Sequence, residues 1–202
     1  MYIPSPFRSP CAEAERQLMR EHPLATLVWS DAEGLQATPL PLLLREDGER
    51  LVLAAHLPRA NPLVQRLQQG EAALLAVFRG PDVYVSPNWL PSKHETHRQV
   101  PTWNYATVHA HGLARLIDDP EWVRAQMAEL TARHEAGEPK PWSLDDAPPE
   151  FTAQLLRVLV GLELRVARLE GKFKLSQNKD ARDRTGILTA LRAHPVGSLM
   201  EA

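Results

Sequence analysis

Residues 84–112 read YVSPNWLPSKHETHRQVPTWNYATVHAHG, a segment with two tryptophans, two tyrosines, four histidines, three prolines and one lysine. Proline rings fix φ and stiffen the chain, and the aromatic side chains provide large rigid surfaces with polar edges. A segment of this composition either buries its rings in the core or presents them to a flat ligand. Its last third, from about Tyr105, continues to Ile117 as a predicted strand.

Short apolar segments bounded by turn residues lie on both sides of this segment. The predicted strands are 24–30, 35–44, 50–55, 73–79, 83–86, 105–117 and 161–176, the last being a strand pair or one long bent strand. Predicted helices cover 10–22 (capped by Ser9), 62–70, 119–134, 151–160 and about 178–194. Because short turns and not helices join most consecutive strands, the sequence argues against a doubly wound parallel sheet. It predicts a mainly β fold with peripheral helices, closed or nearly closed into a barrel, and Pro39 and Pro41 predict an edge or a bulge.

The composition is that of an ordinary soluble domain. The 202 residues suit one domain or one domain with an appendage. Cys11 is the single cysteine, so no internal disulfide can form, and the N-terminal residues lack the apolar core of a signal peptide. These features predict a cytoplasmic protein without a membrane span. The formal net charge of -2 argues against a free-standing DNA reader, which usually carries a basic surface.

A candidate anion site lies at His56-x-x-Arg59-x-Asn61-Pro62. Asn61 is a favourable N-cap and Pro62 a favourable first helical residue. The amide groups at a helix N-terminus and the guanidinium of Arg59 suit a phosphate. The alternative is an ordinary capped helix with a solvated arginine.

A candidate ring site lies in the aromatic segment itself. Trp89, Trp103 and Tyr105 could flank a planar ring, Lys93 could face its negative edge or a phosphate, and Asn104 could hydrogen-bond a ring carbonyl or nitrogen. The alternative is a plug of buried aromatic residues whose polar edges find local partners.

Two further groups of polar residues carry weaker signals. Lys172-x-Lys174-x-Ser176-Gln177-Asn178 could meet an anionic ligand or could cap the last helix. The pairs His94/His97 and His109/His111 have spacings that place each pair on one face of a helix or strand, but no His-Glu-x-x-His helix or cysteine partner supports a metal site. We therefore predict no metal, and we interpret Cys11 as structural. The usual hydrolase, NTPase and dinucleotide motifs are absent from the sequence.

Five blocks in a fixed order resemble the PaiB family, whose members are described as FMN-binding negative transcriptional regulators. They are MYIPSPF (1–7), HLPRANP (56–62), YVSPNWLPSK (84–93), VPTWNYATVHAHG (100–112) and KLSQNKDARDRTGI (174–187). The blocks extend over nearly the whole chain. Their combined order is specific, whereas any one alone would not be.

The resemblance implies an FMN-binding split barrel, a six-stranded Greek-key barrel with helices, over residues 1–202, with a C-terminal helical extension at about 178–202. It also implies a homodimer with FMN at the subunit interface and the phosphate near a strand-to-helix turn, which agrees with the anion site at His56, Arg59 and Asn61. By similarity, Lys93, Trp103, Asn104 and Tyr105 would line the ring side. Lys172 and Gln177 would come from either subunit.

Three functions follow as hypotheses. The first is an FMN-binding regulator of the PaiB type. The second is a flavin-dependent oxidoreductase acting on a small molecule, although the sequence identifies no catalytic base. The third is direct repression at DNA. No helix-turn-helix is evident, but Lys179, Arg182 and Arg184 could give the last helix a local basic face.

Overall fold

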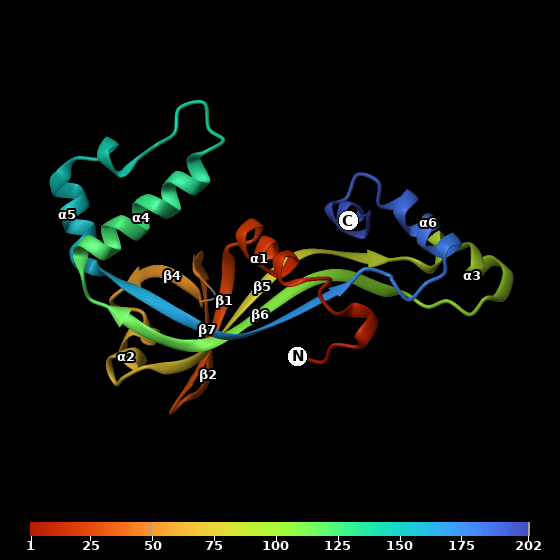
Figure 1. Cartoon of the computed structure of the whole chain (residues 1–202), viewed down its shortest axis with the longest axis horizontal. Helices are drawn as coiled ribbons and strands as arrows, with labels where there is room; N and C mark the ends of the chain where they lie inside the picture. The colour runs from red at the N-terminus through yellow and green to blue at the C-terminus, as the bar shows by residue number, and fades with distance from the viewer. Residues whose placement is uncertain (49, 202) are drawn as a thin grey trace. The chain divides into compact units, whose positions relative to one another are not determined.

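The computed structural model describes residues 1–48 and 50–201 (Figure 1). Its strands are β1 (Leu24–Asp31), β2 (Gly34–Pro41), β3 (Leu43–Asp47), β4 (Arg50–Pro58), β5 (Ala72–Val85), β6 (Thr102–Ile117) and β7 (Leu159–Lys174). Its α-helices are α1 (Ala12–Glu21), α2 (Pro62–Gln68), α3 (Pro91–Thr96), α4 (Pro120–Glu135), α5 (Pro149–Val158), α6 (Ala181–Ala190) and α7 (Pro195–Glu201). Short 3-10 turns are η1 (Ser5–Phe7), η2 (Pro87–Trp89) and η3 (Leu144–Asp146). Among the described residues, no helix combines the length and the apolar sequence that crossing a membrane would need.

The strands form a sheet in the order β2-β1-β5-β6-β7-β4-β3. Pairings of β1 with β2 and β5, and of β4 with β3 and β7, are antiparallel. The first and last strands of this order, β2 and β3, are consecutive in the chain and separated only by Leu42, which is buried. The chain therefore links the two edge strands of the sheet through Leu42, as expected for the predicted split barrel. Counting β2 and β3 as one strand bent at Leu42 gives the six strands that the resemblance implies.

The long strands differ from the sequence prediction in their boundaries. The predicted strands 73–79 and 83–86 are one strand, β5, and the segment from residue 159 to 174 is the single long strand β7. Pro39 lies in β2 opposite Thr26, on a strand whose hydrogen-bonded neighbour in the sheet order is β1 alone. This confirms the predicted edge position, because an edge strand tolerates residues that cannot donate to a ladder.

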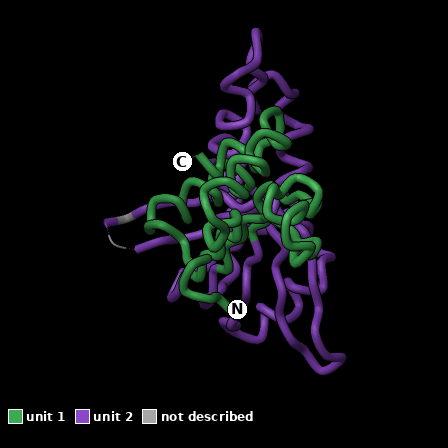
Figure 2. The backbone as a smooth tube through the Cα atoms, turned by 90° about the vertical axis from the view of Figure 1, so that its right-hand side faces the viewer, with its two compact units in different colours: residues 1–22, 78–109, 169–202 green, residues 23–77, 110–168 purple. Residues whose placement is uncertain are grey.

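The chain divides into two compact units that interleave in sequence (Figure 2). Unit 1 contains 1–22, 78–109 and 169–202, and unit 2 contains 23–77 and 110–168. Fully buried apolar side chains fill each unit: Met19, Phe78, Val108, Ile187 and Val196 in unit 1, and Leu27, Leu53, Leu57, Leu162 and Leu164 in unit 2. The strands β5, β6 and β7 contribute residues to both units. The single domain over 1–202 stays a prediction.

Local capping rules hold at three helices and fail at one. The side chains of Asn61, Asp119 and Asp180 each accept a backbone N–H at the start of α2, α4 and α6, and the Asn61 cap was expected. The prediction that Ser9 caps the first helix is wrong. Its hydroxyl donates to the carbonyl of Cys11 at 2.8 Å, and Cys11 occupies the cap position without a side-chain hydrogen bond.

Candidate functional site

Alternation along β6 exposes one row of side chains in unit 1 and buries the other. Asn104, Ala106 and Val108 are buried, whereas Tyr105 is half-buried and Trp103 is 52% exposed. A strand places successive side chains on opposite faces. The structure therefore presents Trp103 and Tyr105 together on one face of β6.

Lysines of β7 lie against this face. The Nζ atom of Lys172 lies 5.4 Å from the ring centroid of Tyr105 and 5.8 Å from that of Tyr2. Lys174 donates from Nζ to the carbonyl of Trp103 at 2.8 Å and also to the hydroxyl of Thr102. We call Trp103, Tyr105, Lys172 and Lys174 the aromatic–lysine face.

A third aromatic ring, that of Tyr84, extends this face. Tyr84 and Trp103 meet edge to face, with ring centroids 6.0 Å apart and planes at 77°. Both rings remain more than two-fifths exposed. The predicted core plug therefore does not describe Trp103, whose ring is accessible to a ligand or a partner.

Positive charges lie close together on and beside the aromatic–lysine face. Burial lowers the pKa of Lys174, and the like charges of Lys172 and Lys179 lower it further. Lys179 donates to the side-chain oxygen of Gln99 at 2.6 Å. Among the described residues, neither Lys172 nor Lys174 has an ion pair with a carboxylate, whereas the charge of Lys179 also acts on Asp183. An anion bound here would relieve their mutual repulsion.

Asn104 and Gln177, two predicted ligand contacts, have hydrogen-bond partners inside unit 1. Asn104 is fully buried, its Oδ1 accepts from the hydroxyl of Ser176 at 3.0 Å, and its Nδ2 lies 3.5 Å from the sulfur of Met200. Gln177 accepts from the N–H of Leu175 at 2.7 Å and donates to a backbone carbonyl at 2.5 Å. Ser176 has a left-handed backbone with φ of 61°, which this side-chain bonding holds in place. A cofactor contact for either amide stays a prediction.

Lys93 lies apart from this set in the fold, on α3, and its side chain makes no hydrogen bond or ion pair with other described residues. The α3 helix belongs to the segment predicted as a loop. Trp89, in η2, packs its backbone against α6: a Cβ added at Gly186 would lie 2.1 Å from the Trp89 carbonyl oxygen. The aromatic segment is thus a built structure and not an open loop.

The predicted anion site lies in unit 2, and its groups already have protein partners. Arg59 forms a two-pronged ion pair with Asp118 and donates from Nε to the carbonyl of Arg157 at 3.1 Å. The hydrogen bond to Asp118 raises the pKa of Arg59, and the same contact lowers the pKa of Asp118. The ring Nδ1 of His56 lies 2.6 Å from Oε1 of the buried Gln126. The Oδ1 of Asn61 accepts a hydrogen bond from the backbone N–H of Leu63 at 3.0 Å, which caps α2.

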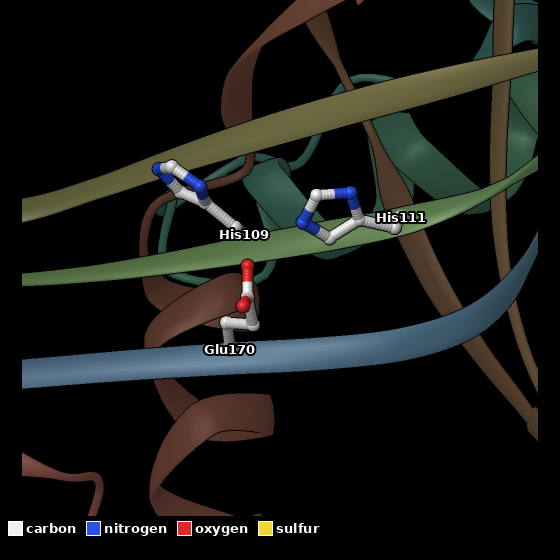
Figure 3. A group of neighbouring side chains, drawn as sticks. All are labelled: His109, His111 and Glu170. Carbon is white, nitrogen blue, oxygen red and sulfur yellow. The ribbon is translucent and has the colours of Figure 1, made fainter. Parts of the chain in front are cut away.

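Two side chains of unit 1 hold potential metal-ligand atoms close together. His109 on β6 and Glu170 on β7 have such atoms within 4.8 Å (Figure 3). His111, which lies two residues farther along β6, belongs to unit 2. Glu170 also accepts from the N-terminal ammonium at 3.0 Å.

Hydrogen-bond partners that lie far apart in the sequence could not be predicted from the sequence. Ser92 on α3 donates from its backbone N–H and its hydroxyl to Asp183 on α6, and Gln99 donates to both side chains. Tyr84 and Glu170 were missed for the same reason. Local sequence carries no sign of partners that are tens of residues distant.

The expected basic face of α6 is occupied by contacts within unit 1. Arg182 forms a two-pronged ion pair with Glu95, at 2.7 Å for each bond. Arg184 donates to the carbonyl of Met200, and Lys179 to Gln99. Cys11, expected inside a helix, is instead exposed at the start of α1.

Known proteins resemble this chain in sequence and in fold. A family model described as "Putative FMN-binding domain" matches residues 1–168. The protease synthase and sporulation protein PAI 2 of Bacillus subtilis is 27% identical over 192 residues, covering 95% of this chain and 89% of that protein. An uncharacterised protein of Saccharomyces cerevisiae is 35% identical over 161 residues, covering 69% and 94%.

A solved structure supports the fold. The FAD and heme binding protein from Mycobacterium smegmatis matches with a TM-score of 0.58 at 17% identity, covering 88% of this chain and 78% of that one. At this identity the likeness concerns the fold alone, which is the flavin-binding split barrel. The match over residues 1–168 shows that the chain belongs to the PaiB-type family of FMN-binding domains, and the cofactor of this family is a flavin.

Proposed function

We propose that the protein binds FMN on the aromatic–lysine face of unit 1 and acts as a regulator of the PaiB type. The observation that carries the proposal is the pair Lys172 and Lys174, neither of which has an ion pair with a described carboxylate, together with the exposed Trp103 that Lys174 contacts. FMN combines a planar ring system with a phosphate. The aromatic side chains suit the rings, and the lysines suit an anionic group.

The chemistry of this face fits the cofactor from the protein's side. Lys172 lies over the ring of Tyr105, and Tyr84 packs edge to face against the ring of Trp103. Lys174 is held by two hydrogen bonds, so its charge has a fixed position. A bound flavin supplies redox chemistry, whereas these residues bind and orient it.

The test is a pair of absorbance titrations, one with FMN and one with riboflavin, which lacks the phosphate. We expect FMN to bind, and to bind more tightly than riboflavin, because charge-assisted contacts to phosphate stabilise the complex. A Trp103→Ala variant should weaken both ligands alike, because it removes a ring contact. No FMN uptake by the purified protein would remove the proposal.

A homodimer forms part of the proposal. Tyr84, Val100 and Trp103 are 45%, 75% and 52% exposed, which is unusual for large apolar side chains gathered in one segment. A second copy would cover them. Light scattering on a size-exclusion column should give twice the mass of the chain, and a monomer at micromolar concentration would count against this arrangement.

Regulation by direct DNA binding has little support from the surface charge. The net charge is -2, and Arg182 and Lys179 on or beside α6 are engaged within unit 1. The regulatory proposal rests on the PAI 2 relative, whose name refers to protease synthesis and sporulation. A mobility-shift assay with a salt series decides between modes: salt-dependent binding supports direct action, and its absence supports an indirect one.

A second candidate function is flavin-dependent oxidation or reduction of a small molecule. His109 and Glu170 favour it, because both can exchange protons and lie on the β6 and β7 strands that carry the aromatic–lysine face. Turnover of NADH or NADPH by the FMN-loaded protein, reduced in His109→Gln, would support an enzyme. Absence of turnover with both nucleotides would leave the regulator.

A further inference from the structure

A cavity of about 580 Å³ lies in unit 1, and its lining includes none of the four residues of the aromatic–lysine face. It is formed by the N-terminal segment, α1, the end of β7, α6 and α7. Its walls include the buried side chains of Leu18, Phe173, Leu175 and Met200. This volume falls in the range of small-molecule sites, which are typically about 300–1,000 Å³ and mostly apolar.

Two arginines line the cavity, and neither has an ion pair. The guanidinium of Arg184 makes one hydrogen bond, from Nη2 to the carbonyl of Met200, and its Nε is buried with no partner. Arg8 is exposed, and its side chain has no hydrogen-bonding or charged partner among the described residues. A buried donor without an acceptor is uncommon in a folded protein and points to a missing polar group.

The opposing charge in the wall is smaller than the positive charge. Glu21 is the carboxylate that lines the cavity, and it accepts from Gln17 at 2.5 Å on the solvent side of α1. Among the described residues, two arginines and one carboxylate therefore line the cavity. The cavity retains a net attraction for an anionic group.

We propose that this cavity binds a small amphiphilic carboxylic acid, with the apolar body among Leu18, Phe173 and Met200 and the carboxylate at Arg184 and Arg8. A guanidinium matches a carboxylate in geometry and charge. The apolar walls disfavour a compact, fully polar anion, because burying its polar surface without partners costs free energy. The cavity shares no lining residue with the proposed flavin face, so we expect both ligands to bind at once.

Calorimetric titration of the FMN-loaded protein with decanoate tests this site, and decanol serves as the neutral comparison. We expect decanoate to bind with a stoichiometry of one per chain and at least about tenfold more tightly than decanol, because only the acid can pair with an arginine. Flavin absorbance is recorded in the same samples and should not change. Equal affinity for both ligands, or release of FMN by decanoate, would overturn the proposal.

Variants locate the site within unit 1. Arg184→Met and Arg8→Met should each weaken decanoate and leave decanol unaffected, while Ala14→Phe should fill the cavity and weaken both. Arg157→Met is the matched control, since Arg157 is exposed on α5 and lines no described cavity. If Arg184→Met fails to fold, Arg8→Met and Ala14→Phe still decide. Decanoate affinity unchanged in both of those variants would refute the assignment.

Discussion

Ser92 and Asp183, 91 residues apart in sequence, share two hydrogen bonds: the backbone N–H of Ser92 donates to one carboxylate oxygen at 2.9 Å, and its hydroxyl to the other at 2.5 Å. Asp183 is 2% exposed. The pair joins α3, in the aromatic segment, to α6. Burial acts to raise the pKa of Asp183, but the hydrogen bonds from Ser92 and the charges of Lys179 and Arg182 outweigh it, so the pKa lies below its usual value.

Replacing Asp183 by Asn should destabilise the protein by about 1–3 kcal/mol at pH 7, because buried donors lose a charged acceptor. A lowered carboxyl pKa contributes stability that is fully present above the unfolded value of about 3.9 and is lost as the pH falls through the folded value. The difference from the unchanged protein should therefore shrink below about pH 4. Urea unfolding monitored by tryptophan fluorescence across pH 3–7 measures this. Asp82→Asn, which removes a surface ion pair with Arg79, is the control and should cost less than about 1 kcal/mol; equal losses in both variants would contradict the role of Asp183.

Lys174→Met should reduce the affinity for FMN by about tenfold and leave riboflavin little changed, because the variant removes a charge that suits the phosphate. The same change should stabilise the ligand-free protein against like-charge repulsion, offset by the loss of the bonds to Thr102 and Trp103. Absorbance titration provides both affinities. Lys140→Met, an exposed lysine between α4 and α5, is the matched control. A parallel fall for both ligands would show that Lys174 does not contact the phosphate.

Arg59→Ala should leave the ratio of FMN affinity to riboflavin affinity unchanged, because the guanidinium of Arg59 already donates hydrogen bonds to Asp118 and to the carbonyl of Arg157. Asp118→Asn gives the complementary measurement. If Arg59 binds the phosphate, weakening its ion pair should strengthen FMN binding, and Arg59→Ala should weaken it. Those two results together would support the anion site proposed from the sequence over the lysines of unit 1.

Gly186→Ala should destabilise the protein by about 1–3 kcal/mol, because the added Cβ would lie 2.1 Å from the carbonyl oxygen of Trp89 and force α6 away from η2. Gly137→Ala is the control: nothing lies within 4 Å of its added Cβ, so it should be neutral or stabilising by up to about 1 kcal/mol. Thermal unfolding followed by circular dichroism compares them. A Gly186→Ala variant as stable as Gly137→Ala would show that the approach of α6 to Trp89 is not tight.

Much of the fold was predictable because its signals are local. Asn61, Asp119 and Asp180 each satisfy an amide within three residues, so their helix starts follow from short sequence patterns. Ser9 failed as a cap because its hydroxyl found a nearer acceptor at Cys11. Strand boundaries were less predictable: β5 continues through Gly80 and Pro81, residues that in sequence predict a turn.

The candidate site divides in the same way. The order of the aromatic and basic blocks identified the family, and alternation along β6 fixes which rings share a face. The partner of each charge was not predictable, since Arg59 meets Asp118 and Lys172 meets Tyr105 across 59 and 67 positions. The sequence by itself determined the starts of α2 and α4, the barrel class and the flavin-binding family, because capping acts over neighbouring residues, and strand alternation and motif order can be read directly along the chain. Only the tertiary structure decided which partners each cation meets, because those contacts depend on strands and helices brought together from distant parts of the chain.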